Sequence, residues 1–204
     1  MLQPDQFYHI YNHANGNENL FREEKNYFFF LQKIKRYLSP YITLYAYCLM
    51  PNHFHLLVRI RGEWEIKNLF INSETYQHLG ERERDNFIYK KISKAFANLG
   101  SSYAQALNKM YGRKGSLFMP NFKNNPVEDD LAFCKLIHYI HANPVHHGFV
   151  RDLKKWRFSS YHSLLSEKDT KLERTYVMSI FGGRKAFLEY HSQPVLQKNK
   201  WHDL

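Results

Sequence analysis

The sequence is poor in cysteine and contains no long apolar run. Only two cysteines, Cys48 and Cys134, occur among its 204 residues, too few and too far apart for a disulfide framework or a four-thiolate zinc site. We expect both to be reduced and to pack as small core residues. No stretch approaches the roughly 20 apolar residues that a membrane span needs, and the N-terminus has no secretory-signal pattern. These absences predict a soluble cytoplasmic protein with no membrane partner.

Acidic side chains are also scarce, and the chain is strongly basic as a result. It has 19 Asp and Glu against 29 Lys and Arg, which gives a net charge of +10 and a pI near 9.5. Such an excess favours a polyanionic partner, and nucleic acid leads because neutralised phosphates release counterions. Aromatic residues, at 17%, suit base stacking as well as a Phe- and Tyr-rich core. The length predicts one globular domain with additions.

Hydrophobic periodicity predicts the order strand, helix, strand, strand, followed by helices. The two middle strands should form a hairpin, and a later long helix should kink at Gly100-Ser101-Ser102. The tail after Glu167 carries a short helical signal, and its polar end is expected to fray. The expected strands span 6–13, 42–49 and 53–60, and the expected helices lie at 23–38, within 61–84 ahead of a loop, and at 88–110.

A further helix is predicted to begin at Asn125 and to end near Asn143. Asn125 can cap a helix, Pro126 suits the first helical position, and Glu128 stands three residues after the cap. Pro144 should end the helix, because proline disfavours helical geometry in the residue before it.

Two histidines flank one apolar residue in the segment Met50-Pro51-Asn52-His53-Phe54-His55-Leu56-Leu57-Val58. Alternation along a strand places both imidazoles on one face and Phe54 on the other. The pair could hold a metal ion, or it could be two polar residues on the open face of a half-buried strand. Taken alone, the pattern favours the second interpretation.

The predicted helix at 125–143 supplies groups that a histidine pair lacks. Tyr139 and Asn143 are four residues apart and share a face, with Lys135 on the same side. Two imidazoles and the Asn143 amide oxygen suit Mg²⁺ or Mn²⁺ with open positions better than a closed zinc site. Tyr139 could act as a nucleophile, but a phenol with a pKa of about 10 needs activation, to which the metal and Lys135 could contribute. Tyr103 is the rival tyrosine.

A basic turn follows the long helix. Arg113 and Lys114 stand between Gly112 and Gly115, so that charge is combined with a backbone free to approach a phosphate. A solvated turn explains the pattern equally well. We take Arg113, Lys114 and Lys123 as candidate DNA contacts.

Several motifs in this chain together resemble one family, the single-tyrosine HUH transposases, and within it the REP-associated tyrosine transposases. They are Met-Pro-Asn-His-Phe-His-Leu-Leu, Tyr139-Ile140-His141-Ala142-Asn143-Pro144-Val145, His147-Gly148, and Trp156-Phe158-Ser159-Ser160-Tyr161. The resemblance implies an α+β fold with a ferredoxin-like (RRM-like) antiparallel sheet and helices packed on one face. It places the transposase domain at residues 1–165, with a helical insertion at about 63–125, and leaves 166–204 as a C-terminal extension.

The resemblance also implies a reaction. His53, His55 and Asn143 would be ligands of Mg²⁺ or Mn²⁺, and Tyr139 would attack a scissile phosphate in single-stranded DNA beside a hairpin. The products are a 5′-phosphotyrosine link and a free 3′-hydroxyl, without ATP. We therefore expect a nucleoid-associated enzyme, monomeric or homodimeric. The alternatives are a non-cleaving DNA- or RNA-binding module on the same fold and a zinc hydrolase that uses His53 and His55.

Overall fold

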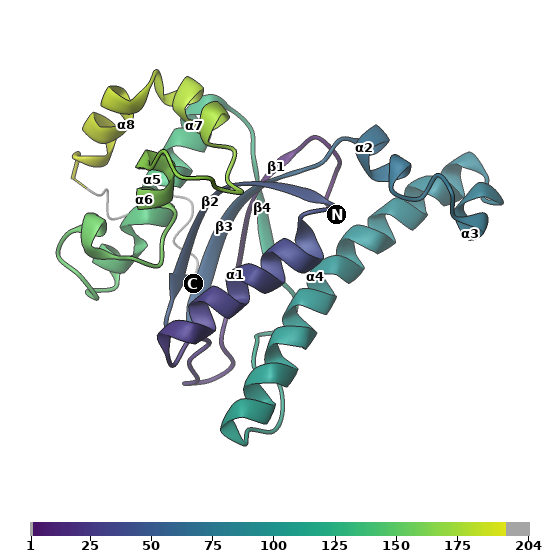
Figure 1. Cartoon of the computed structure of the whole chain (residues 1–204), viewed down its shortest axis with the longest axis horizontal. Coiled ribbons are helices and arrows are strands. Elements are labelled where there is room, and N and C mark those ends of the chain that lie inside the picture. The colour runs from purple at the N-terminus through teal and green to yellow at the C-terminus, as the bar shows by residue number, and fades with distance from the viewer. Residues whose placement is uncertain (1, 195–204) are drawn as a thin grey trace.

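A four-stranded antiparallel sheet lies at the centre of the computed structural model, which describes residues 2–194 (Figure 1). The strand order is β2-β3-β1-β4, and α1 and α4 connect β1 to β2 and β3 to β4. This is the ferredoxin-like arrangement, so the predicted fold class is confirmed. The polar end expected to fray lies mostly beyond residue 194, outside the described residues. The strands are β1 (Phe7–His13), β2 (Ile42–Met50), β3 (His53–Ile60) and β4 (Lys123–Val127).

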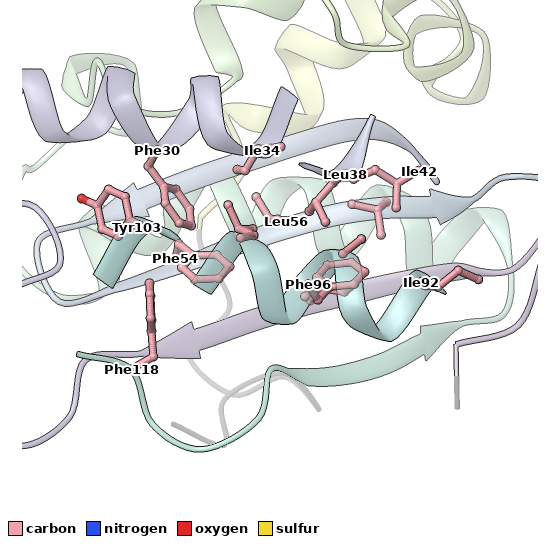
Figure 2. Close-up of a cluster of buried hydrophobic side chains, with 14 of the residues drawn as sticks. Phe30, Ile34, Leu38, Ile42, Phe54, Leu56, Ile92, Phe96, Tyr103 and Phe118 are labelled. Atoms are coloured by element: carbon pink, nitrogen blue, oxygen red, sulfur yellow. The ribbon is translucent and has the colours of Figure 1, made fainter. Parts of the chain in front are cut away.

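Helices cover both faces of the sheet. Helices were expected on one face. On that face α1 and α4 pack over the apolar side of β3, which is formed by Phe54, Leu56 and Val58 (Figure 2). The opposite face, which carries Leu57, packs against α5 and the C-terminal helices α7 and α8. The helices are α1 (Glu24–Leu38), α2 (Glu63–Asn68), α3 (Glu74–Gln77), α4 (Glu81–Tyr111), α5 (Asp130–His146), the 3₁₀ helix η1 (Leu153–Lys155), α6 (Tyr161–Leu165), α7 (Arg174–Phe181) and α8 (Arg184–His191).

The C-terminal third of the chain covers the exposed edge of β2. Leu49 N donates to Phe158 O, Ser160 N to Tyr47 O and Glu173 N to Leu44 O, each at 2.9 Å. An open sheet edge is a template for association with another chain. Residues 158–173 satisfy part of this edge within the molecule. How the chain divides into domains at residue 165 stays a prediction.

The predicted helix start at Asn125 is wrong. Asn125 and Pro126 lie in β4, which pairs with β1, and α5 begins at Asp130, where the Asp129 carboxylate accepts a hydrogen bond from Ala132 N at 2.7 Å. A proline is tolerated in an edge strand because no partner needs its missing N–H. The segment predicted as a helical insertion therefore contributes α4 to one layer and most of β4 to the sheet.

Two other predicted helix boundaries are also corrected. Helix α5 continues through Pro144 to His146, and His147 N still donates to Asn143 O at 3.1 Å. Pro144 lies in the last turn of α5. Because proline has no backbone N–H, only the one intrahelical hydrogen bond that residue 144 would donate is lost. Helix α4 includes Gly100 without a break, and a side chain there would meet Phe122 at 3.3 Å. Gly100 thus allows close packing, and Glu81–Arg84, predicted as loop, is the first turn of α4.

Both cysteines are free, Cys48 buried and Cys134 half-buried. Within residues 2–194, no helix has the length and apolar character to cross a bilayer.

The N-cap of α5 tests the corrected helix start. Asp129→Ala removes the carboxylate that caps the helix, and we expect the free energy of unfolding to fall by about 1 kcal/mol. Asn125→Ala changes a strand residue and should alter it by less than about 0.5 kcal/mol. Urea unfolding followed by circular dichroism measures both. A larger loss of unfolding free energy in Asn125→Ala than in Asp129→Ala would contradict a start of α5 at Asp130.

Candidate active site

His53 on β3 and Asn143 on α5 meet in the interior between the sheet and the helix. Their closest atoms, His53 Nε2 and Asn143 Oδ1, are 2.8 Å apart, and both residues are 1% exposed. On the other side of the ring, His53 Nδ1 lies 2.8 Å from Asn52 Oδ1, while Asn52 Nδ2 faces His13 Nε2 at 3.0 Å. With its amide oriented this way, Asn52 Oδ1 accepts a hydrogen bond from His53 Nδ1.

His53 is therefore a neutral ring with a lone pair facing an oxygen. Burial lowers its pKa to about 4, so only one ring nitrogen carries a proton at neutral pH, and Asn52 holds that proton at Nδ1. Nε2 and Asn143 Oδ1 are then two acceptors in contact. A cation shared by the two atoms removes the conflict. Rotation of the Asn143 amide, which presents its N–H to His53, also removes it.

His55, next to His53, has a second ring nitrogen without a partner within residues 2–194. His55 Nδ1 lies 2.9 Å from His9 Nε2, and His55 Nε2 is buried without a hydrogen-bond partner among the described residues. Burial first, and then the neighbouring histidines, hold the pKa of His55 well below its usual range. The His53 and His55 rings are 5.1 Å apart and nearly perpendicular. The prediction that both side chains share one face of β3 is confirmed.

Tyr139 stands on α5 beside these rings. Its ring is 5.5 Å from that of His55 and 6.0 Å from that of His9, in edge-on contact with each. Burial raises the pKa of Tyr139 to about 12, and a hydrogen bond with Asn143 opposes the rise. The phenol is thus protonated at neutral pH, and only an added positive charge would make it a good nucleophile.

The donor set fits a divalent cation. Two neutral imidazoles and one amide oxygen leave coordination positions open for water or phosphate oxygens. Among residues 2–194, no three His, Cys, Asp or Glu side chains gather as a metal cluster, so a cation held by His53 and His55 would take the Asn143 oxygen as its third protein ligand. His53, His55, Tyr139 and Asn143 are each at most 4% exposed. The site is closed in this conformation, and a substrate can enter only after a rearrangement.

The rival Tyr103 lies on the other side of the sheet. It is fully buried in the core between α1, α4 and the sheet (Figure 2), and its hydroxyl donates to Leu20 O at 2.7 Å. Burial raises its pKa. These contacts give Tyr103 a structural role.

The predicted basic residues are not gathered at the site. Lys135 is exposed one turn before Tyr139, and no hydrogen bond or ion pair joins it to another described residue. Arg113 forms an ion pair with Glu18 at 3.0 Å and its side chain is only 9% exposed, so it is poorly placed to contact DNA. Lys114 is exposed on the turn. Lys123 is exposed opposite Tyr11 on β4, on the histidine side of the sheet, since directly paired residues share a face.

Several residues of the site were missed from the sequence. His9, Tyr11 and His13 alternate along β1 and so share the face of His53 and His55, and the His147 ring lies 4.8 Å from that of His53. The spacing of two residues in β1 was a usable signal, because it is the same alternation that marked β3. The position of Asn52 as partner of His53 depends on the turn geometry, which the sequence does not reveal.

A second buried histidine pair ties α5 to the C-terminal extension. His141 Nδ1 lies 2.9 Å from His191 Nε2 on α8, and His141 Nε2 lies 2.8 Å from Ser160 Oγ. Ser160 Oγ in turn accepts from Tyr47 N on β2 at 2.9 Å, and His191 Nδ1 donates to Phe187 O at 2.8 Å. Because His141 lies between Tyr139 and Asn143, this chain of bonds fixes the turn of α5 that carries both site residues.

Two comparisons with known proteins find similar chains. A Haemophilus influenzae protein named as a REP-associated tyrosine transposase is 25% identical over 137 residues, or 66% of this chain and 64% of that protein. A solved structure, described as the REP-associated tyrosine transposase bound to a REP hairpin, superposes with a TM-score of 0.56 and 15% identity over 82% of this chain and 83% of that one. No protein-family model matches the chain.

The chain resembles the REP-associated tyrosine transposases. The resemblance expected from the motifs is confirmed in sequence by the first relative and in fold by the second. The matched stretch spans just under two thirds of the length of the H. influenzae transposase.

The His141–His191 pair makes stability depend on pH. Burial lowers the pKa of His191 to about 3, from an ordinary value of 6.5. The unfolded chain therefore binds a proton near pH 6.5 that the folded chain excludes, so stability is complete above that pH and falls as the pH drops toward 3. Each such histidine should cost about 1.4 kcal/mol per pH unit in this range. We expect His191→Gln to reduce the slope of unfolding free energy against pH between pH 6.5 and 4.

Urea unfolding at several pH values measures this slope, with His78→Gln, a change at an exposed histidine, as the control. Equal slopes in the wild type and in His191→Gln would contradict the prediction.

Proposed function

We propose that this chain is a metal-dependent, single-stranded DNA endonuclease and strand transferase that uses Tyr139 covalently. The observation that carries the proposal is the contact of His53 Nε2 with Asn143 Oδ1, next to the His55 ring with its orphaned Nε2 and to the Tyr139 ring. The resemblance to REP-associated tyrosine transposases supports the same activity. On this basis the substrate is DNA with a hairpin next to the cleavage site, and the protein acts at the nucleoid.

The chain's own side chains would divide the work. His53, His55 and Asn143 would hold Mg²⁺ or Mn²⁺, which neutralises charge on the scissile phosphate. Tyr139 Oη forms a bond to phosphorus, and the bond from phosphorus to the 3′ oxygen breaks. The phenol proton is lost as Oη attacks, and the departing 3′ oxygen gains a proton. Because the phosphodiester energy is kept in the tyrosine link, a 3′-hydroxyl can reverse the step on another strand.

The neighbours of the ligands would set their tautomers. Asn52 holds the His53 proton at Nδ1, and His9 bonds to His55 Nδ1, so both Nε2 atoms are free to bind a cation. Outer hydrogen bonds of this kind orient metal-binding histidines. The low pKa values of His53 and His55 keep both rings neutral, as ligands must be.

Tyr139→Phe tests the nucleophile. We expect it to abolish the covalent adduct, because phenylalanine has no oxygen to attack phosphorus, while Tyr103→Phe should retain the adduct. The substrate is a hairpin oligonucleotide labelled at its 3′ end, so that a 5′-phosphotyrosine link transfers the label to protein on a denaturing gel. An adduct that persists in Tyr139→Phe sinks the assignment. If Tyr103→Phe loses the adduct while circular dichroism shows intact folding, the nucleophile is assigned to Tyr103 instead.

Metal binding in the absence of DNA tests the ligand set separately. We expect Mn²⁺ titrated calorimetrically to bind the wild type, and His55→Ala to lose detectable binding. His9→Leu should weaken binding about 10- to 100-fold, since it removes only the hydrogen bond that orients His55. His78→Ala is the control. Equal affinities in the wild type and His55→Ala would exclude this metal site.

The alternative of a non-cleaving module makes a different prediction for the same samples. Such a protein would bind the hairpin without divalent ions and give no adduct on any substrate. A zinc hydrolase would instead retain Zn²⁺ tightly; the ligand set proposed here has two histidines and an amide oxygen, one short of the usual three strong protein ligands.

A further inference from the structure

A groove between α1 and α4 concentrates positive charge far from the histidines. It has a volume of about 300 Å³, and its walls carry Arg36, Tyr37 and Tyr41 on one side and Lys91, Lys94 and Asn98 on the other. We call it the α1–α4 groove. Both helices cover the sheet face opposite the histidines (Figure 1), so the groove does not belong to the candidate active site.

No acidic side chain neutralises these cations. The sequence has no Asp or Glu in residues 25–62 or in residues 86–127, and these two ranges include both walls. Within residues 2–194, none of the ion pairs includes Arg36, Lys91 or Lys94. Elsewhere, Arg22, Arg59, Arg61, Lys67, Arg113 and Arg157 each form an ion pair with an acidic side chain.

Two of the groove cations lie against aromatic rings, and a hydrogen bond joins the two helices. Lys33 Nζ on α1 donates to Ser102 Oγ on α4 at 2.7 Å, and Arg36 Cζ lies 5.6 Å from the centre of the Tyr37 ring. Lys91 Nζ lies 4.7 Å from the centre of the Phe87 ring. The pKa of Tyr37 is lowered, first by a hydrogen bond with Ser102 and then by Lys33 and Arg36, in agreement with a positive local field. Unneutralised, partly immobilised cations of this kind favour an anionic partner.

The aromatic rings indicate which form of nucleic acid fits. Proteins that bind single strands stack bases on exposed aromatic faces. Here Tyr37 and Tyr41 are half-buried between the helices, and Lys33 and Arg36 lie 5.7 and 5.6 Å from the centre of the Tyr37 ring. Few ring faces remain for stacking, so the groove offers mainly charge. Charge without stacking suits a duplex, whose phosphates are outside and whose bases are paired within.

We propose that the α1–α4 groove binds the phosphate backbone of a DNA duplex, and that this duplex is the stem of the hairpin substrate. The second half of this statement rests on the proposed function, while the first half does not. The stem would lie against α1 and α4, and the single strand beside it would pass around the sheet to Tyr139.

Removal of the three unpaired cations tests the proposal. The variant Arg36→Gln/Lys91→Gln/Lys94→Gln is compared with Lys154→Gln/Lys155→Gln/Lys168→Gln, which removes the same charge from exposed positions in the C-terminal third. The first probe is a blunt DNA hairpin without single-stranded tails, and its binding is followed by fluorescence anisotropy at several salt concentrations. The second readout is the Tyr139 adduct on the 3′-labelled hairpin oligonucleotide that also tests the nucleophile.

We expect the groove variant to bind the blunt hairpin at least about tenfold more weakly and to lower the slope of log affinity against log salt by about 2 to 3. The control variant should do neither, and both should keep the wild-type melting temperature. If the two variants lose the same affinity for the blunt hairpin, net charge alone explains the effect and the proposal is overturned. Unchanged hairpin binding in the groove variant, or stronger groove-dependent binding of an RNA stem than of the DNA stem, would also overturn it.

The two proposals fail separately. If the wild type forms no adduct but the groove variant alone loses duplex binding, the groove assignment stands and the proposed function falls. If the wild type forms the adduct and the groove variant binds the blunt hairpin normally, the proposed function stands and the groove assignment falls.

Discussion

The contact between His53 on β3 and Asn143 on α5 is the constraint on which the site depends. It joins residues 90 positions apart through atoms separated by 2.8 Å, in an interior that contains no water-facing surface to satisfy them otherwise. Desolvation keeps the imidazole neutral, and neutrality turns the contact into a pair of acceptors. Two unsatisfied acceptors in contact are costly in a protein core. A cation shared by the two atoms, or rotation of the Asn143 amide, removes that cost.

The bonds around this contact allow the fold to tolerate it. His9 and Asn52 satisfy the far nitrogens of His55 and His53, and the His141–His191 pair with Ser160 fixes the turn of α5 between Tyr139 and Asn143. Buried polar networks hold one geometry firmly when most of their members are satisfied. The C-terminal extension therefore does more than cover the edge of β2, because α8 supplies one end of the network that sets the position of the tyrosine helix.

Side-chain periodicity was sufficient to predict the parts of the site that lie within one element. Alternation placed His53 and His55 on one face, and a spacing of four placed Tyr139 with Asn143. The start of α5 was predicted wrongly because Asn125 and Pro126 satisfy the rules for a helix cap, while their actual position in an edge strand depends on pairing with β1. The roles of His9 and His13 were missed for a related reason: which strand lies next to β3 is a tertiary fact. No local pattern could reveal that the Arg113 charge is taken by Glu18.

The shared location of Tyr139 and Asn143 limits how the closed site can open. Both residues lie on α5, one turn apart, so a displacement of the whole helix that exposed the phenol would also separate Asn143 from His53. An opening that keeps the proposed ligand set would instead leave the His53–Asn143 contact in place and uncover Tyr139 by rotation of its own side chain or by movement of neighbouring segments. Tyr139 contacts the His55 and His9 rings by their edges, and such contacts are worth about 1 kcal/mol each. Rotation of the tyrosine would also break its hydrogen bond with Asn143. Displacement of the helix would break these contacts together with the anchoring of α5 through His141, so the smaller movement is the one that costs less.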